Sequence, residues 1–257
     1  AAREFERAGG THLIIAHLPH TERGVEKDHR PAFELTLSLA EKVRRGTGLK
    51  VFVTVGPYPV ELLRLADHMP LSDAVDIMKR GMDTAAKLVE EGKVIAIGEI
   101  GRPHFPVDSQ ILEASNEILR CGMKLASEVE CPVVLHTESA TPKVFKELAL
   151  MADRSGLKRD KVVKHFSTPI VDTERNCGLF PSIVSSRRNI TEAISQGNRF
   201  LMETDYLDDL KRPGAVLGPA TVAKRTKAFL ADGTFTEEDL LKIHKDNPEQ
   251  IYGVRFD

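Results

Sequence analysis

Residues 94–137 read VIAIGEIGRPHFPVDSQILEASNEILRCGMKLASEVECPVVLHT, and this stretch decides the fold. Two short apolar runs, VIAIGE (94–99) and PVVLHT (132–137), flank a segment of helical periodicity from about Asp108 to Val129. Runs that are apolar at nearly every position are typical of parallel strands buried on both faces. The stretch therefore predicts a strand–helix–strand unit of a parallel sheet.

The same alternation extends along the chain in both directions. It predicts strands at THLIIAH (11–17), KVFVTVG (50–56), VVKHF (162–166), GLFPSIVSS (178–186) and FLMETD (200–205), and helices at 32–46, 72–92, from Thr141 and Pro142, and at 187–196. Seven strands that follow an opening helix indicate a TIM (β/α)8 barrel whose first strand is absent from this chain. An open doubly wound sheet is the alternative, although no GxGxxG turn is present.

Bulk properties suggest one soluble domain over residues 1–257. The 36 basic residues nearly balance the 38 acidic ones, so no overall basic field favours nucleic acid. Three cysteines without CxxC spacing indicate neither a thiolate zinc site nor a disulfide framework, and the apolar runs fall well short of a membrane span of about 20 residues. We therefore expect a cytoplasmic protein, with no membrane and no protein partner indicated.

Four chemically active residues stand at the ends of separate apolar runs. Their positions are Glu99, His136, His165 and Asp205. The carboxyl ends of parallel barrel strands form one rim, so these side chains are expected to converge there. Imidazole and carboxylate together suit zinc, manganese or iron better than calcium, and we interpret the four residues as metal ligands.

Asp205 is also the candidate proton acceptor, because a bound cation lowers the pKa of its water and makes a nucleophile available near neutral pH. Glu203 lies two residues earlier. Strand alternation puts both carboxylates on the same face if the strand persists to its end.

At this point the motifs resemble a known family. The segments GEIG (98–101), VVLHTES (133–139), KHFS (164–167), METDY (202–206) and DNPEQIYG (246–253) resemble those of the TatD-like metal-dependent hydrolases, in the amidohydrolase superfamily. The resemblance follows the family order from Thr11 to Val254 and is closest to a divergent, archaeal-type branch.

The resemblance implies a TIM barrel with up to two divalent metal ions (Zn, Mn or Mg). Glu99 would bridge the two ions and act in catalysis with Asp205, while His136 and His165 would hold one ion. The implied substrate is a phosphodiester, such as a DNA end, cleaved by metal-activated water as in a deoxyribonuclease.

The chain also departs from the family pattern. The family's first strand carries an HxH pair that supplies two ligands, and no HxH occurs in these 257 residues. We expect that pair just upstream of Ala1, with His17 and His20 as a less favoured substitute. Where the family has GxHP, this chain has Tyr58 in GPYP (56–59), and its hydroxyl could contact a phosphate oxygen.

The segment GRPHFPVD (101–108) offers Arg102 and His104 where the family has an aspartate. Arg102 is expected either to clamp an anionic group or to pair with a nearby acid. With the same metal centre, hydrolysis of a lactone, amide or other ester is the alternative activity. A catalytically impaired barrel that acts as a binding protein is the third possibility.

Overall fold

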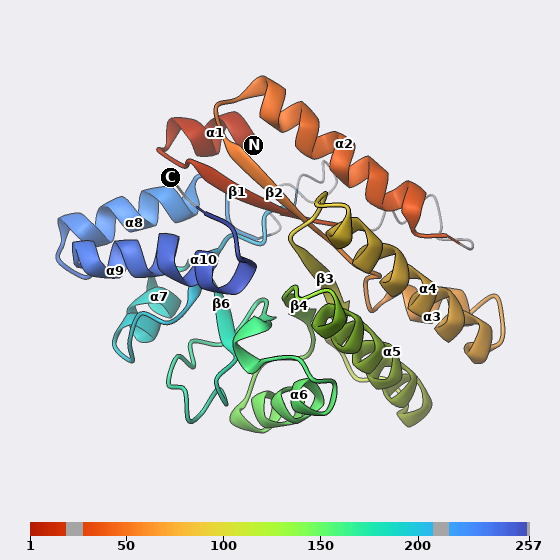
Figure 1. The fold of residues 1–257 in the computed structure, drawn as a ribbon. Helices are drawn as coiled ribbons and strands as arrows, with labels where there is room; N and C mark the ends of the chain where they lie inside the picture. The colour runs from red at the N-terminus through yellow and green to blue at the C-terminus, as the bar shows by residue number, and fades with distance from the viewer. Residues whose placement is uncertain (19–27, 208–215, 256–257) are drawn as a thin grey trace.

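The computed structural model describes residues 1–18, 28–207 and 216–255. In these ranges seven parallel strands form one sheet, and strands that are neighbours in the sequence are neighbours in the sheet. Figure 1 shows the sheet curling at the centre of the molecule, with the helices arranged around its outer side. The strands are β1 (His12–Ala16), β2 (Lys50–Val55), β3 (Ala96–Gly101), β4 (Val133–His136), β5 (Val162–Lys164), β6 (Phe180–Val184) and β7 (Leu201–Glu203).

Helices fill most of the connections between successive strands. They are α1 (Ala2–Arg7), α2 (Arg30–Gly46), α3 (Glu61–Ala66), α4 (Leu71–Glu90), α5 (Ser109–Glu128), α6 (Pro142–Arg154), α7 (Arg187–Ile194), α8 (Thr221–Ala231), α9 (Glu237–Leu241) and α10 (Asn247–Tyr252). A π-helical turn, Lys242–Asp246, joins the last two. No helix in the described ranges combines the length and apolar character of a membrane span.

The sequential order of the parallel strands confirms the predicted TIM-type fold class. A doubly wound sheet reverses its strand order at a switch point, so that alternative is excluded. In the part of the chain that is described, β1 and β7 are the two edges of the sheet. The eighth strand expected between them stays a prediction.

Side-chain caps fix where several helices begin, and the cap residues can be read from the sequence. Asp108, Thr141 and Ser186 each accept a hydrogen bond from the backbone three residues later, at the starts of α5, α6 and α7. Thr236 and Asp239 form the reciprocal capping box that the S/T-x-x-D spacing predicts for α9. These caps place the helix starts directly after the strand-end loops.

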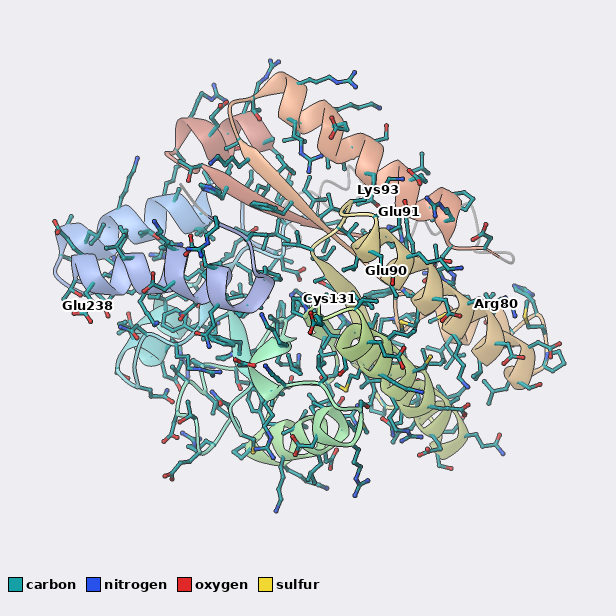
Figure 2. All side chains as sticks on the ribbon, in the orientation of Figure 1. Arg80, Glu90, Glu91, Lys93, Cys131 and Glu238 are labelled. Atoms are coloured by element: carbon teal, nitrogen blue, oxygen red, sulfur yellow. The ribbon has the colours of Figure 1, made fainter. Side chains whose placement is uncertain are left out.

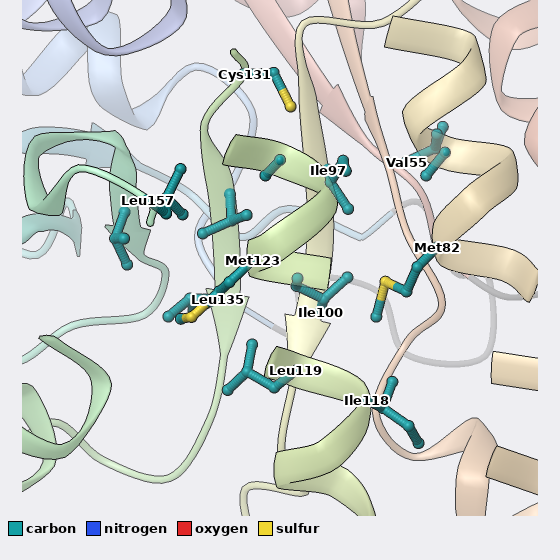
Figure 3. Close-up of a cluster of buried hydrophobic side chains, with 14 of the residues drawn as sticks. Val55, Met82, Ile97, Ile100, Ile118, Leu119, Met123, Cys131, Leu135 and Leu157 are labelled. Carbon is teal, nitrogen blue, oxygen red and sulfur yellow. The ribbon is translucent and has the colours of Figure 1, made fainter. Parts of the chain in front are cut away.

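The core beneath the rim is packed between β3, β4 and the helices α4 and α5. Figure 3 shows Ile97, Ile100, Met82, Met123 and Leu119 interdigitating there, and each is at most 1 % exposed. By contrast, charged side chains at the helix periphery face outward in Figure 2, including that of the labelled Glu238. The result is a rigid support under the ends of β3 and β4.

The three cysteines form no disulfide bond with one another. Cys121, Cys131 and Cys177 are free thiols. Burial raises the pKa of Cys131 to about 11, so this thiol remains protonated and behaves as a small apolar side chain.

Two glycines let β3 and β4 approach closely at the rim. A Cβ at Gly98 would lie 2.6 Å from the Cβ of Val134, and one at Gly101, whose φ is +144°, would lie 2.2 Å from the carbonyl oxygen of His136. The β3–β4 register shifts between Gly98 and Ile100, so Glu99 stands out of the regular ladder. Its carboxylate is thereby brought toward the neighbouring strand ends.

The structure differs from the sequence predictions mainly at element ends. Strand β5 ends at Lys164 and β7 at Glu203, each two residues earlier than predicted, because the chain turns away at the rim. Asp205 has a φ of +50°, which takes its backbone out of the strand conformation. Helix α3 (Glu61–Ala66) was not predicted, since its six residues are too few to show a clear period.

Candidate metal centre

Three predicted ligands meet at the carboxyl-terminal rim. One Glu99 oxygen lies 3.4 Å from Nδ1 of His136, and the other lies 3.4 Å from Nε2 of His165. A ligand atom from each of the three residues lies within 4.8 Å of the others. The two imidazole rings stack with centroids 5.8 Å apart. Strand ends far apart in the sequence thus form one compact group.

The fourth predicted ligand, Asp205, approaches the same group from the loop after β7. Its Oδ1 lies 3.6 Å from Nε2 of His165. Nε2 of His165 therefore faces two carboxylates, those of Glu99 and Asp205. This nitrogen is the centre of the cluster.

The spacing of these atoms fits a divalent cation better than a direct hydrogen bond. Nδ1 of His136 is buried and has no hydrogen-bond partner among the described residues, although a Glu99 oxygen is 3.4 Å away. An N–H···O bond is normally about 2.7 to 3.2 Å long. Two ligands that each lie about 2.1 Å from one tetrahedral cation are about 3.4 Å apart. This pair of atoms therefore has the separation expected of two ligands of one ion, and the three ligand atoms together lie within 4.8 Å of one another.

His165 is anchored on its other side by Glu203, at the end of β7. Nδ1 of His165 lies 3.0 Å from a Glu203 oxygen. The same carboxylate accepts hydrogen bonds from the backbone N–H of Phe166, at 2.8 Å, and from the hydroxyl of Ser182. Glu203 was not among the predicted site residues, although the E-x-D spacing in METDY was the signal that could have identified it.

His136 is contacted on its other side by two of the predicted substrate-binding residues. Nε2 of His136 lies 3.1 Å from the Tyr58 hydroxyl and 2.9 Å from Nδ1 of His104. The Tyr58 and His104 rings both lie against the His136 ring, with centroids 4.8 and 5.0 Å away. The loops after β2 and β3 thus converge on the end of β4.

Arg102 lies at the end of β3 and is only 3 % exposed. Its guanidinium donates two hydrogen bonds to the Glu138 carboxylate and lies 3.5 Å from Glu147. The structure thus favours the second of the two roles considered for this residue, pairing with a nearby acid. Its role as a substrate clamp stays a prediction.

His17 is buried at the end of β1 and lies outside the cluster of mutually close ligand atoms. Its Nδ1 lies 2.7 Å from the Thr36 hydroxyl, and its ring packs edge-on against Phe33 of α2. His20, its proposed companion, falls outside the described residues. The substitute ligand pair therefore stays a prediction.

Burial and neighbouring charges shift the pKa values of the clustered residues in opposite directions. Burial alone would lower the pKa of His165, but the Glu203 and Glu99 carboxylates raise it to about 10. Burial alone would raise the pKa of Glu99, but the charge at His165, with His136 beside it, holds that pKa below its usual value. Burial raises the pKa of Asp205 to about 6, against the pull of His165.

A buried cation lies next to the ligand cluster. Nζ of Lys164, which is 1 % exposed, donates to the backbone carbonyl of His165 at 2.5 Å and lies 3.5 Å from that of Thr137. Burial lowers the pKa of Lys164 to about 8, although the carboxylates of Glu203 and Glu138 oppose the effect. The lysine joins the ends of the two strands that carry the histidines.

Comparison with known proteins shows the family to which the chain belongs. The family model described as "TatD related DNase" matches residues 1–253. The chain is 40 % identical over 254 residues to the uncharacterized protein MJ1127 of Methanocaldococcus jannaschii, which covers 98 % of this chain and 89 % of that protein.

Solved structures share the fold at lower sequence identity. The TatD homologue YJJV of Escherichia coli K12 superposes with a TM-score of 0.67 at 22 % identity, covering 98 % of this chain and 90 % of that chain. An organophosphorus hydrolase from Deinococcus radiodurans gives a TM-score of 0.57 at 15 % identity, with 95 % and 91 % covered. The archaeal-type branch and the upstream HxH strand stay predictions, but the family itself is confirmed. The chain belongs to the TatD family of metal-dependent hydrolases.

Proposed function

We propose that this metal-dependent hydrolase cleaves phosphodiester bonds, as a deoxyribonuclease of the TatD type that acts at DNA ends. The observation that carries the proposal is the Glu99 carboxylate placed 3.4 Å from Nδ1 of His136 and 3.4 Å from Nε2 of His165. The matching family model, described as "TatD related DNase", supports the choice of bond. Three free thiols support a reducing, cytoplasmic compartment.

The proposed ligands are Glu99, His136, His165 and Asp205, and the proposed ion is zinc, manganese or magnesium. When bound, such a cation polarises the phosphoryl oxygens and lowers the pKa of a coordinated water. A second ion would require the HxH pair expected upstream. Glu99 would then serve both ions, since its carboxylate offers two oxygens.

Asp205 is the proposed proton acceptor. Its Oδ1 lies 3.6 Å from Nε2 of His165, so a proton collected there would be held beside the reacting group. The pKa of Asp205, raised by burial to about 6, leaves the carboxylate largely ionised at neutral pH and still basic enough to take a proton. Glu203 is already engaged by His165, Phe166 and Ser182, so Asp205 is the freer base.

A second candidate activity is hydrolysis of an uncharged ester, such as a lactone, or of an amide. It is favoured by Arg102, whose guanidinium is bound by Glu138 and approached by Glu147 rather than directed at a substrate phosphate. A neutral substrate needs no such clamp. The fold shared with the organophosphorus hydrolase is compatible with this chemistry but does not decide it.

One assay separates these activities. The protein would be depleted of metal, reloaded with Mn²⁺ or Zn²⁺, and given an end-labelled single-stranded DNA, bis(p-nitrophenyl) phosphate and a panel of lactones. We expect metal-dependent cleavage of the DNA and the phosphodiester, and loss of both in Glu99→Gln. Turnover of lactones alone would replace the nuclease proposal with the second candidate. Metal binding without any turnover would support the binding-protein alternative.

A further inference from the structure

The two ring nitrogens of His136 face different surroundings. Nδ1 faces Glu99 across 3.4 Å, whereas Nε2 lies 2.9 Å from Nδ1 of His104 and 3.1 Å from the Tyr58 hydroxyl. A neutral imidazole carries a hydrogen on one nitrogen and a lone pair on the other. The Tyr58 oxygen and a lone pair on Nδ1 of His104 can each accept a hydrogen bond from Nε2–H, and a hydrogen placed there leaves the lone pair of Nδ1 directed at Glu99.

We infer that Tyr58 and His104 are positioning residues, which hold His136 in the tautomer that presents Nδ1 to the metal position. The inference rests on the proposed metal centre. It assigns to both side chains a role on His136 that differs from direct contact with the substrate. Neither residue would touch the cation.

In His165, the other imidazole of the cluster, the two ring nitrogens have exchanged these roles. Nδ1 of His165 is bound by the Glu203 carboxylate, and Nε2 is directed at Glu99 and Asp205. An outer partner that takes the N–H of a metal-binding histidine fixes its tautomer and its ring orientation. In this chain a carboxylate does so for His165, and a phenol together with a third imidazole does so for His136.

The backbone around Tyr58 is held in place from behind. Its N–H donates to a Glu61 oxygen at 2.9 Å, and Glu61 is 5 % exposed and lies 3.6 Å from the buried ring of His29. Pro57 and Pro59 flank the tyrosine and restrict its backbone further. The phenol is therefore presented to His136 by a stiff segment.

His104 is held less tightly than Tyr58. It is exposed, although prolines at 103 and 106 stiffen its loop and the Phe105 ring packs edge-on against it at 5.0 Å. The Tyr58 hydroxyl and Nδ1 of His104 thus compete for the single Nε2–H of His136. The tyrosine lies in a segment fixed by buried residues, whereas the histidine lies in an exposed loop. Each can take over from the other, so the loss of one is expected to matter less than the loss of both.

The test compares Tyr58→Phe, His104→Phe and the double variant by Zn²⁺ affinity, measured in competition with a chelating dye. Loss of an outer partner typically costs about 10- to 100-fold in metal affinity. We expect about 3-fold weaker binding in each single variant and about 10- to 100-fold in the double variant. His104→Gln keeps an acceptor oxygen and should bind Zn²⁺ nearly as the parent does. His68→Gln, at an exposed histidine after α3, is the matched control.

A second readout needs neither metal nor turnover. Nitrogen-15 spectra of histidine-labelled, metal-free protein report the tautomer of His136, which we expect to carry its hydrogen on Nε2 in the parent and to become mixed in the double variant. A hydrogen on Nδ1 in the parent would overturn the inference. So would a double variant with unchanged Zn²⁺ affinity and a raised KM, because that pattern marks substrate contact. A parent that binds no Zn²⁺ would instead refute the proposed metal centre.

Discussion

The two imidazoles of the cluster are held by chemically different surroundings. The His165 side chain is 8 % exposed and is bound by the Glu203 carboxylate, which also accepts from Phe166 and Ser182. The His136 side chain is 15 % exposed and is contacted by Tyr58 and His104, neither of which is an acid. Charge-assisted bonds are about twice as strong as neutral ones, and burial strengthens them further. The His165 side is therefore the fixed half of the centre and the His136 side the adjustable half.

The largest effect should come from Glu99, which serves both halves. Glu99→Gln removes the charge shared by the two imidazoles, and we expect turnover to fall by about 100-fold or more and Zn²⁺ binding to be lost. The barrel should remain folded, because the side chain stands at the rim and outside the apolar core. Metal content, turnover and thermal unfolding of the purified variant would check this. Unchanged turnover would remove Glu99 from the centre.

Glu203→Gln tests whether the carboxylate makes the His165 half the stronger one. The variant keeps the shape but loses the charge, and Zn²⁺ affinity should fall about 10- to 100-fold. This loss should exceed that of Tyr58→Phe, which removes only a neutral acceptor. Ser182→Ala is the control, since it takes one donor from Glu203 and leaves the bond to His165. A larger loss in Tyr58→Phe than in Glu203→Gln would reverse the comparison.

The raised pKa of His165 predicts how the metal-free protein responds to alkali. Because the folded protein holds this proton more tightly than the unfolded chain does, the stabilisation is fully present below pH about 6.5 and is lost as the pH rises toward 10. We expect the melting temperature to fall by roughly 5 °C or more across that range. His165→Gln should flatten the curve. An unchanged slope in that variant would show that another group is responsible.

His244 is a partly buried histidine whose pKa is shifted by desolvation and by no carboxylate among the described residues, so it serves as a comparison for the carboxylates around His165. Nε2 of His244 lies 2.9 Å from the Thr226 hydroxyl, and burial lowers the pKa of His244 to about 4. The unfolded chain takes up this proton first, so stability should decrease as the pH falls from about 6.5 toward 4. The expected decrease is about 1 to 3 kcal/mol, measured by urea unfolding. His244→Gln should remove it, and an equal slope in both proteins would contradict the assignment.

The fold and the four ligands could be predicted from the sequence because both follow from a pattern that recurs along the chain, an apolar strand that ends in a polar residue. Apolar runs mark buried parallel strands, and polar residues at their carboxyl ends share one rim, so Glu99, His136 and His165 could be placed together in advance. Asp205 was placed for the same reason, although its strand ends two residues before it.

The surroundings of the ligands were not accessible in the same way. Tyr58 and His104 lie in irregular loops, where no period tells which way a side chain points. Their convergence on His136 depends on the packing of two loops against β4. The pairing of Arg102 with Glu138 likewise joins the ends of adjacent strands, and the sequence could only leave both of its roles open. The local sequence pattern was enough to predict the metal ligands. The residues that contact those ligands depend on how separate loops pack together, which the local pattern does not show.

The glycines at 98 and 101 determine how closely β3 and β4 approach each other at the proposed metal centre. Because β-carbons there would come within 2.6 Å of Val134 and 2.2 Å of the His136 carbonyl, any larger residue must act as a spacer that pushes β3 from β4. The span from Glu99 to His136 would then widen, and their ligand atoms would no longer lie at the separation that suits one small ion. The distance between the carboxylate and the imidazole of the proposed metal centre thus depends on two residues that have no side chain.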